Sequence, residues 1–289
     1  MKAAIFYFSE SGNTEKVAIA IYERLEKAGY EVTPVRFQDL DDLPAAADGV
    51  DLFAAGFPTF FGYPPKFVSD ALKSLRRVRG TDAIVFTTYG GITAGDSLYE
   101  AASTLAKKGY RILGGLKIEG NDDYPQGREL KINMGRPDED DLRAAARFVD
   151  KILEAKAAGH SLDPAALASH TQFFVENRGK PRRRVVGRIR RPIEGKIEFN
   201  PKQCIFCVTC IQSCPTRSIR KGDRTPEFSW KCIDGVRCYQ CVRVCPGKAF
   251  TVSYPRPVGE YPELTALYAD SPEEKRRRYI VAGEQDRGR

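Results

Sequence analysis

The first 203 residues of this 289-residue chain contain no cysteine, and all eight cysteines fall between Cys204 and Cys245. The chain has only two histidines, His160 and His170, which we expect to be solvated rather than catalytic. No apolar run approaches the length of a membrane span. The first apolar stretch ends at Glu10, too early for a signal-peptide core. These absences predict a cytoplasmic protein without a membrane span, whose closely spaced thiols bind metal rather than form disulfides.

Charge is distributed unevenly along the chain. Residues 1–150 carry 19 Lys/Arg against 23 Asp/Glu, whereas residues 151–289 carry 27 against 15. A chain of this length and this asymmetry is expected to form two domains. We predict a first domain over 1–156, a basic linker over 157–194, a cysteine-rich domain over 195–255 and a carboxyl-terminal extension over 256–289.

The first domain alternates apolar strands with amphipathic helices. Residues 3–8 form an unbroken apolar run, which is typical of a strand covered on both faces. Further strands are expected near 31–37, 51–57, 82–88 and 111–118, and helices near 15–29, 65–78, 95–108 and 138–156. This order predicts an α/β domain with an open parallel sheet of about five strands and helices on both faces.

Three loops follow strands of this sheet, at the edge where such sheets bind ligands. Residues 9–14, SESGNT, combine hydroxyls and a glycine with a helix amino terminus, which predicts an anion site or simply a capped helix. The loop lacks the Walker lysine and the GxGxxG pattern, so NTPs and dinucleotides are less favoured. Residues 56–65 and 87–99 add aromatic rings that suit a flat ring system or fill a core.

Together, these loops resemble those of the flavodoxin family, whose phosphate loop is similar to residues 9–14. The resemblance implies bound FMN, with Glu10 pointing outward, away from the phosphate. Which aromatic ring stacks on the flavin is left open. The residues expected to bind FMN are Ser9, Ser11, Gly12, Asn13, Thr14, Pro58, Thr59, Phe60, Phe61, Gly62, Tyr89, Gly90, Gly91 and Asp96.

The cysteines form two similar runs. The first, CIFCVTCIQSCP, has the spacing C-x2-C-x2-C-x3-C-P, which indicates an iron–sulfur cluster. The second, CIDGVRCYQCVRVCP, keeps the last two spacings but separates Cys232 from Cys238 by five residues. Zinc is the weaker alternative, because a zinc ion needs only four ligands and no terminal Cys-Pro.

This region resembles a two-cluster bacterial ferredoxin of small α+β fold, which implies two [4Fe–4S] clusters. On that resemblance Cys204, Cys207 and Cys210 bind one cluster together with Cys245. Cys214, Cys238 and Cys241 bind the other, and Cys232 is the cysteine left for its fourth position. We expect the second run to be a working site with a longer loop.

The linker contains a basic run at 176–192, with eight Lys/Arg and one acid. It is either a solvated linker or a docking surface for an acidic redox protein. Nucleic acid is not expected as a partner, because no nucleic-acid motif accompanies the run. The oligomeric state is open, a homodimer included.

A chain holding FMN and iron–sulfur clusters is expected to transfer low-potential electrons between the clusters, the flavin and a redox partner. The alternative is an FMN-dependent reductase of a small molecule that receives electrons through the ferredoxin part. Tyr63, Tyr89 and Asp96 are its candidate proton donors. No nicotinamide-binding domain is recognisable, so NAD(P)H is not the expected direct donor.

Overall fold

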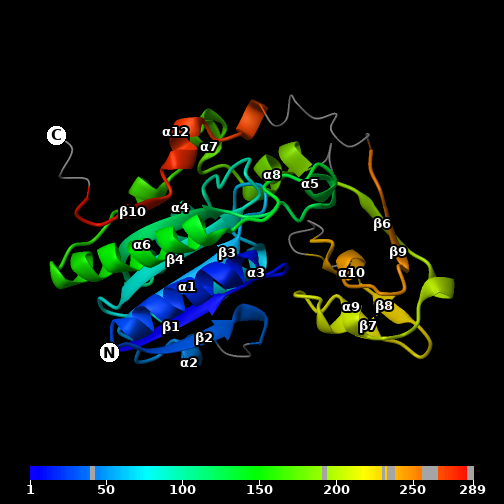
Figure 1. Cartoon of the computed structure of the whole chain (residues 1–289), viewed down its shortest axis with the longest axis horizontal. Helices are drawn as coiled ribbons and strands as arrows, with labels where there is room; N and C mark the ends of the chain where they lie inside the picture. The colour runs from blue at the N-terminus through cyan, green and yellow to red at the C-terminus, as the bar shows by residue number, and fades with distance from the viewer. Residues whose placement is uncertain (40–42, 191–193, 230–231, 233–237, 256–265, 285–289) are drawn as a thin grey trace.

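The computed structural model describes residues 1–39, 43–190, 194–229, 232, 238–255 and 266–284. Within these ranges the chain forms an α/β layer structure with a smaller cysteine-bearing module beside it (Figure 1). The loop between Cys232 and Cys238 lies outside the described residues, as do the parts of the predicted linker and extension at 191–193, 256–265 and 285–289.

The larger part is built on five parallel strands in the order β2-β1-β3-β4-β5. Strands β1, β3 and β4 are buried along almost their whole length, because their Ala, Ile, Val, Leu and Phe residues face helices on both sides. The strands are β1 Lys2–Tyr7, β2 Glu31–Arg36, β3 Leu52–Pro58, β4 Asp82–Tyr89 and β5 Arg111–Glu119. The predicted doubly wound parallel sheet is confirmed.

Helices cover both faces of this sheet. Helix α1 packs beside α6 on one face, and α3 packs beside α4 on the other. The helices are α1 Asn13–Lys27, α2 Leu43–Ala46, α3 Lys66–Ser74, α4 Ser97–Lys107, α5 Pro125–Glu129 and α6 Glu139–Ala157, with a 3-10 turn η1 at Phe37–Asp39. Helix α6 begins at a capping box, in which the Asp138 and Asp141 side chains accept each other's backbone N–H groups.

A sixth strand, β10 (Tyr279–Val281), joins the sheet from the carboxyl-terminal segment. It pairs antiparallel with β5, and Val281 is buried in the main core. Helix α12 (Pro272–Arg276) precedes it and begins at Ser271, whose hydroxyl accepts the Glu274 N–H. The sequence pattern predicts only the five parallel strands.

The segment after α6 packs on the larger part rather than extending into solvent. It forms the 3-10 turn η2 (Pro164–Leu167) and the helices α7 (Gln172–Asn177) and α8 (Arg182–Arg190). A second apolar cluster forms here, from residues of three separate segments: Tyr63, Phe173, Phe174, Val185, Val186 and Tyr268.

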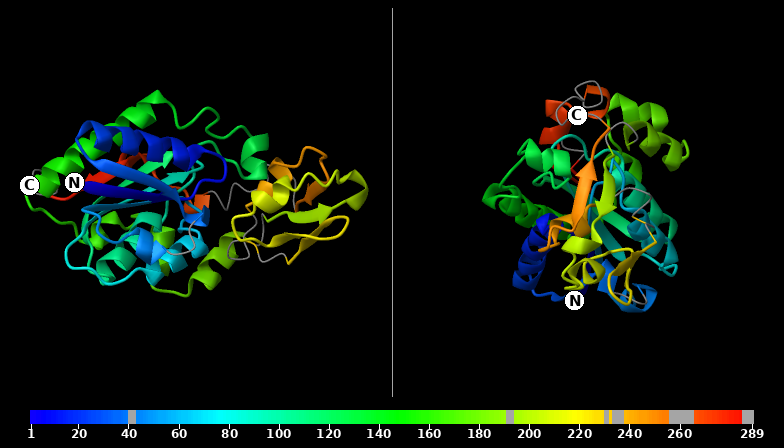
Figure 2. Two further views of the ribbon diagram at one scale, coloured as in Figure 1. Left: turned by 90° about the horizontal axis from the view of Figure 1, so that it is seen from below. Right: turned by 90° about the vertical axis from the view of Figure 1, so that its right-hand side faces the viewer.

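The cysteine-bearing module stands beyond the carboxyl ends of the parallel strands, as the two views agree (Figures 1 and 2). Strand β6 (Lys196–Phe199) pairs antiparallel with β9 (Phe250–Ser253), and β7 (Ile219–Lys221) pairs with β8 (Pro226–Phe228). Each cysteine run contains a short helix, α9 (Thr209–Gln212) or α10 (Gln240–Arg243), and the 3-10 turn η3 spans Pro201–Gln203. No helix in the described ranges is long and apolar enough to cross a membrane.

Candidate functional site

A pocket of about 290 Å³ opens at the carboxyl edge of the sheet, where the loops after β1, β3, β4 and β5 meet. We call it the edge pocket. Eleven of the fourteen residues predicted to bind FMN line it: Ser9, Ser11, Asn13, Thr14, Pro58, Thr59, Phe60, Phe61, Gly62, Tyr89 and Gly90.

The loop after β1 presents an anion-binding helix terminus to the edge pocket. Gly12 has φ +92° and is the amino-terminal cap of α1, a backbone conformation that favours glycine. The Gly12 N–H donates to Ser9 Oγ over 3.1 Å. The first N–H groups of α1 have no partner within the helix, so they can bind an anion.

Two side chains of the same loop connect it to neighbouring strands. Asn13 Nδ2 donates to the Asn121 carbonyl over 2.9 Å and to Asp123 Oδ2 over 3.0 Å. Thr14 and Thr88 share a hydrogen bond of 2.8 Å between their hydroxyls. These bonds fix the phosphate-type loop against β4 and the loop after β5.

Three predicted residues lie away from the pocket lining. Gly12 and Gly91 shape the backbone of their loops, both at positive φ. Asp96 is buried at the start of α4, where it pairs with Arg178 over 2.8 Å and accepts the Ser169 N–H over 3.0 Å. Asp96 therefore connects α4 to the segment after α6 instead of facing the pocket.

Of the three candidate proton donors, only Tyr89 reaches the pocket. Its hydroxyl donates to Glu119 Oε1 over 3.2 Å, and burial raises the pKa of Tyr89 far above its usual range. Tyr63 packs edge-on against Phe174, with the Arg182 guanidinium 5.2 Å from its ring centre.

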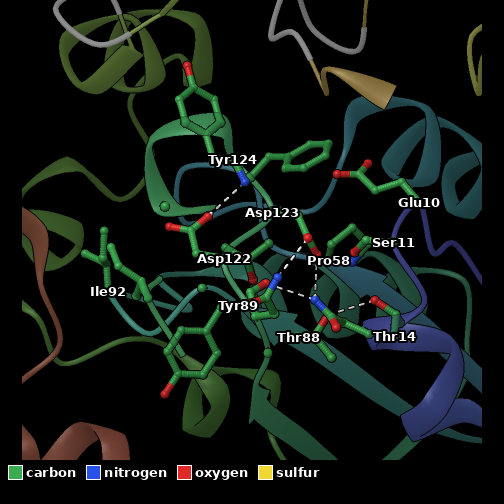
Figure 3. A pocket seen from close by; sticks show the side chains of 18 of the residues that line it. Glu10, Ser11, Thr14, Pro58, Thr88, Tyr89, Ile92, Asp122, Asp123 and Tyr124 are labelled. Carbon is green, nitrogen blue, oxygen red and sulfur yellow. Dashed lines mark hydrogen bonds between the residues drawn. The ribbon is translucent and has the colours of Figure 1, made fainter. Parts of the chain in front are cut away.

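The sequence patterns missed a fourth wall, the loop after β5. Gly120, Asn121, Asp122, Asp123 and Tyr124 line the pocket from this side. Figure 3 shows the last three of them. Other lining residues outside the predicted set are Glu10, Thr88, Ile92, Thr93, Gly127, Leu130, Ile132, Cys238 and Tyr268. Only the position of the loop at a strand's carboxyl end could have indicated the fourth wall.

Carboxyl groups are concentrated in the pocket. Glu10, Asp122 and Asp123 all line it (Figure 3). Burial, with a further contribution from the Asp123 charge, raises the pKa of Asp122 to about 6, although the Tyr124 N–H partly stabilises its charged form. The Asp122 side chain packs closely against the backbone of Gly90, because a Cβ atom added to Gly90 would lie 2.7 Å from the Asp122 carboxyl carbon.

Glu10 does not point outward as expected. Its side chain is only 9% exposed and faces Arg243 of the module, 3.9 Å away. Burial raises the pKa of Glu10 to about 7, against the opposing effect of the Arg243 charge. Within the described residues Glu10 Oε2 is buried without a hydrogen-bond partner.

The cysteines line two cavities in the module. Cys204, Cys207, Cys210 and Cys245 line the first, which we call the outer cavity. Cys214, Cys232, Cys238 and Cys241 line the second, the inner cavity. Each cavity thus takes three cysteines from one run and the Cys-Pro cysteine of the other.

The thiols within each cavity influence one another. Burial raises the pKa of Cys210, and the thiols of Cys245, Cys204 and Cys207 raise it further. Burial likewise raises the pKa of Cys241 to about 12, with contributions from Cys232 and Cys214. Thiols whose pKa is raised in this way are neutral, and a bound metal centre would deprotonate them and be neutralised by their thiolate charges.

The backbone around the two cavities is repeated although the sequences differ. Val208 and Tyr239 each follow a cavity cysteine and precede a short helix, with φ +58° and +57°. A β-branched residue at positive φ is strained and persists where the surrounding structure enforces it. Arg217 and Lys248, three residues after each Cys-Pro cysteine, repeat the pattern at φ +50° and +51°.

The module meets the larger part at the inner cavity. Cys238 lines both the inner cavity and the edge pocket. Arg243 Nη1 donates to the Asp123 carbonyl over 3.1 Å, and the hydroxyls of Tyr124 and Tyr239 lie 3.3 Å apart. The Tyr239 hydroxyl also bonds both backbone groups of Gly195.

Comparisons with known proteins agree with this architecture. Residues 5–131 match the family model of flavodoxin, and residues 196–246 match that of the 4Fe-4S dicluster domain. No curated protein matches the chain.

Among solved structures, the chain is similar to a flavodoxin from the domain Archaea, with 23% identity over 53% of this chain and 97% of that one at a TM-score of 0.42. It is similar to oxidised flavodoxin 2 from Bacillus cereus, with 25% identity over 53% and 99% of the two chains at 0.42. It is also similar to rubredoxin oxygen:oxidoreductase from Desulfovibrio gigas, with 21% identity over 53% and 37% at 0.39.

Fold, pocket and cysteine cavities define a protein that combines a flavin-binding domain with an iron–sulfur domain. The chain carries a flavodoxin domain at 5–131 followed by a 4Fe-4S dicluster domain at 196–246, the order of domains in a flavodoxin–ferredoxin fusion. Its domains make it an FMN and iron–sulfur electron-transfer protein.

The residues present fit these groups. The edge pocket combines a helix amino terminus for a phosphate with aromatic side chains for a ring system. Within the described residues, no three His, Cys, Asp or Glu side chains converge as tightly as a single metal ion requires. The four thiols that line each cavity are the ligand type of iron–sulfur clusters, which would supply one-electron chemistry when bound.

Proposed function

We propose that this protein carries electrons between a redox partner and FMN through two [4Fe–4S] clusters in the module. The observation that carries the proposal is the position of Cys238, which lines both the inner cavity and the edge pocket. A cluster held there would adjoin the flavin, whereas a cluster in the outer cavity would face the solvent side, where Cys207 is exposed.

The ligand sets of this proposal follow the two cavities. Cys204, Cys207, Cys210 and Cys245 would bind the outer cluster, and Cys214, Cys232, Cys238 and Cys241 the inner one. Sulfur hydrogen bonds support the assignment. The N–H groups of Phe206 and Ala249 donate to Cys204 and Cys245 over 3.4 and 3.3 Å, and such bonds tune cluster potentials.

FMN would bind in the edge pocket. The loop at 9–14 would hold its phosphate, and the loops at 58–62 and 89–91 would contact its ring system. When bound, the flavin exchanges one or two electrons and each cluster one, so the chain can convert single-electron into paired transfers. The protein contributes the fixed geometry: Arg243 joins the module to the flavin loops through the Asp123 carbonyl.

The three side chains that the sequence suggested as proton donors of a small-molecule reductase do not support that alternative. A reductase needs proton donors that face the flavin. Tyr63 and Asp96 are committed to packing and to an ion pair outside the edge pocket. Tyr89 directs its hydroxyl to Glu119.

The partner, in this proposal, is an acidic one-electron redox protein that docks at the outer cavity. Ile205 is 67% exposed beside Cys204. The Ile205 side chain lies near Gly247, because a Cβ atom added to Gly247 would be 3.8 Å from Ile205 Cγ1. Lys202 and Lys248, both exposed, flank this apolar contact in the sequence. The basic run at 176–192 is less available for docking a partner, because Arg178 and Arg182 pack against the flavodoxin domain.

Anaerobic purification followed by measurement of flavin, iron and sulfide tests the cofactor content. We expect one FMN and eight irons per chain. Four irons would contradict the two-cluster proposal, and protein without flavin would contradict FMN binding.

Stopped-flow reduction with a one-electron donor protein tests the order of transfer. In the loaded chain, the iron–sulfur absorbance should bleach before the flavin absorbance. A Cys207→Ala variant should retain the inner cluster and FMN but accept electrons from the donor protein at least tenfold more slowly. Simultaneous or flavin-first reduction in the parent would contradict the proposed route.

A further inference from the structure

The carboxyl-terminal segment, residues 266–284, lies outside both family matches yet packs against the flavodoxin domain. Figure 1 shows its helix α12 beside α7, above the sheet. Strand β10 and the buried Val281 and Ala282 secure its end in the main core. A segment attached this firmly has a defined position relative to the edge pocket.

One residue of the segment enters the pocket wall. Tyr268 lines the edge pocket and is only 6% exposed. Its ring packs near Phe173, with ring centres 6.4 Å apart. Burial raises the pKa of Tyr268 to about 12, and the Asp122 charge across the pocket adds to this effect.

A second residue of the segment organises the loop after β4. Asp270 Oδ1 accepts hydrogen bonds from the hydroxyls of Thr93, over 2.6 Å, and Thr171, over 2.9 Å. Asp270 Oδ2 accepts the Ala94 N–H over 3.2 Å, and the Asp270 N–H donates to the Ile92 carbonyl over 2.8 Å. Ile92 and Thr93 line the edge pocket. Asp270 thus holds three consecutive residues of the loop after β4, two of which line the pocket.

Further contacts attach the segment around Asp270 to the sheet. Lys117 on β5 is buried, lies 3.9 Å from Asp270 Oδ2 and binds Glu274 Oε1 over 2.6 Å. The Lys117 N–H donates to the Arg278 carbonyl over 2.7 Å. These contacts fix both ends of α12 against β5.

We propose that the carboxyl-terminal segment completes the FMN site. Tyr268 supplies a wall that contacts the bound nucleotide, and Asp270 is a positioning residue that holds the Ile92–Ala94 loop in its binding conformation. This inference rests on the proposed binding of FMN in the edge pocket.

The test measures FMN affinity in the full chain, by flavin fluorescence on flavin-depleted protein. Asp270→Asn keeps the shape of the side chain but presents an amide to the Ala94 N–H or to the threonine hydroxyls. We expect it to weaken FMN binding about tenfold. Glu273→Gln is the matched control, because it removes the same charge from an exposed residue of α12 and should leave the affinity unchanged.

Tyr268 is tested by a pair of variants. Tyr268→Ala removes the wall and should weaken binding at least tenfold, whereas Tyr268→Phe keeps the ring and should stay within twofold of the parent. Iron content and the cluster spectra should not change in any variant. Affinity is compared at a temperature where circular dichroism shows each depleted variant to be folded.

The outcomes separate this inference from the proposed function. If the parent binds FMN and both Asp270→Asn and Tyr268→Ala bind it within twofold of the parent, the segment is not part of the site. If Glu273→Gln weakens FMN binding as much as Asp270→Asn, the loss of affinity comes from the change in net charge and not from the position of the loop. That result would also overturn the inference. A parent that binds no FMN would overturn the proposed function itself.

Discussion

At the scale of single residues, placing three carboxyl groups around one pocket costs free energy. Glu10, Asp122 and Asp123 all line the edge pocket, where few counter-charges are available. Burial disfavours the ionised carboxylate, which explains the raised pKa values of Glu10 and Asp122. Negative charge near the flavin opposes the arrival of an electron, so these residues should lower the flavin's reduction potential.

Asp122→Asn is expected to raise the midpoint potential of the bound flavin. The substitution removes one negative charge while it keeps the oxygen that accepts the Tyr124 N–H. Charges several ångströms apart in a protein interact by roughly 1 to 2 kcal/mol, so the shift should be about 50 mV. Spectroelectrochemical titration at pH 8 measures it, and the exposed Asp70→Asn serves as the charge-matched control.

The size of this shift should depend on pH. Because the pKa of Asp122 is about 6 in the folded protein, the parent carboxyl is charged at pH 8 and largely protonated at pH 5. The difference between parent and variant should therefore shrink as the pH falls through 6. An equal difference at pH 8 and pH 5 would show that the Asp122 charge does not act on the flavin.

At the scale of elements, the contact between β5 and α12 depends on a buried ion pair. Lys117 and Glu274 have side chains exposed by only 6% and 8%. A buried pair contributes little relative to apolar residues, but removal of one partner leaves an uncompensated charge. The pair therefore makes the attachment of the carboxyl-terminal segment sensitive to single substitutions.

Glu274→Ala is expected to lower the free energy of unfolding of the flavodoxin domain by about 3 kcal/mol. The double variant Lys117→Met/Glu274→Leu should recover part of that loss, because both charges of the pair are gone, although the buried Asp270 also loses the ammonium group 3.9 Å from its Oδ2. Glu273→Ala, exposed on the same helix, should change stability by less than about 0.5 kcal/mol. Urea unfolding followed by circular dichroism measures all three, and a loss of stability in the double variant equal to that of Glu274→Ala would contradict the argument.

The sequence predicted those elements whose pattern is local. Apolar runs such as residues 3–8 and 82–88 gave the parallel strands, since burial on both faces leaves an unbroken hydrophobic signal. Strand β10 left no such signal, because its three residues follow a charged stretch and are selected by pairing with β5. Short antiparallel edge strands depend on a distant partner that local pattern does not reveal.

The functional site was likewise predicted only where its sequence signal is local. Loops rich in glycine, hydroxyls and aromatic rings were recognised, and they meet at the edge pocket. Tyr268 and Cys238 were not associated with that pocket, because they reach it from segments more than a hundred residues away. Composition also could not show which way a side chain turns: Asp96 faces Arg178, and Glu10 faces Arg243.

At the scale of the whole molecule, the uneven distribution of charge is expected to guide an acidic partner to the basic half of the chain. The chain has a formal net charge of +8, carried by its second half. Opposite charge on a partner raises the rate of encounter by up to several orders of magnitude, and salt suppresses this steering. The exposed lysines beside the outer cavity are therefore expected to set the rate at which an acidic donor protein reduces the module.

Reversal of these charges tests where the partner docks. Lys202→Glu/Lys248→Glu should slow reduction by a plant-type [2Fe–2S] ferredoxin, an acidic one-electron donor, about tenfold at low ionic strength. At high salt the rates of parent and variant should converge, because screening removes the steering. Reduction by dithionite and the FMN and iron contents should not change. Stopped-flow spectroscopy at several salt concentrations provides the measurement.

The control for this test carries the same change in net charge at a different place. Lys27 and Lys107 are exposed in the last turns of α1 and α4. Those turns are at the sheet edge opposite the edge pocket, so Lys27→Glu/Lys107→Glu should leave the rate nearly unaltered. If this control slows reduction as much as the lysine pair beside the outer cavity, net charge alone governs encounter. If neither pair does, while Arg183→Glu/Arg184→Glu on α8 does, the donor docks on the basic run of the flavodoxin side and electrons do not enter at the outer cavity.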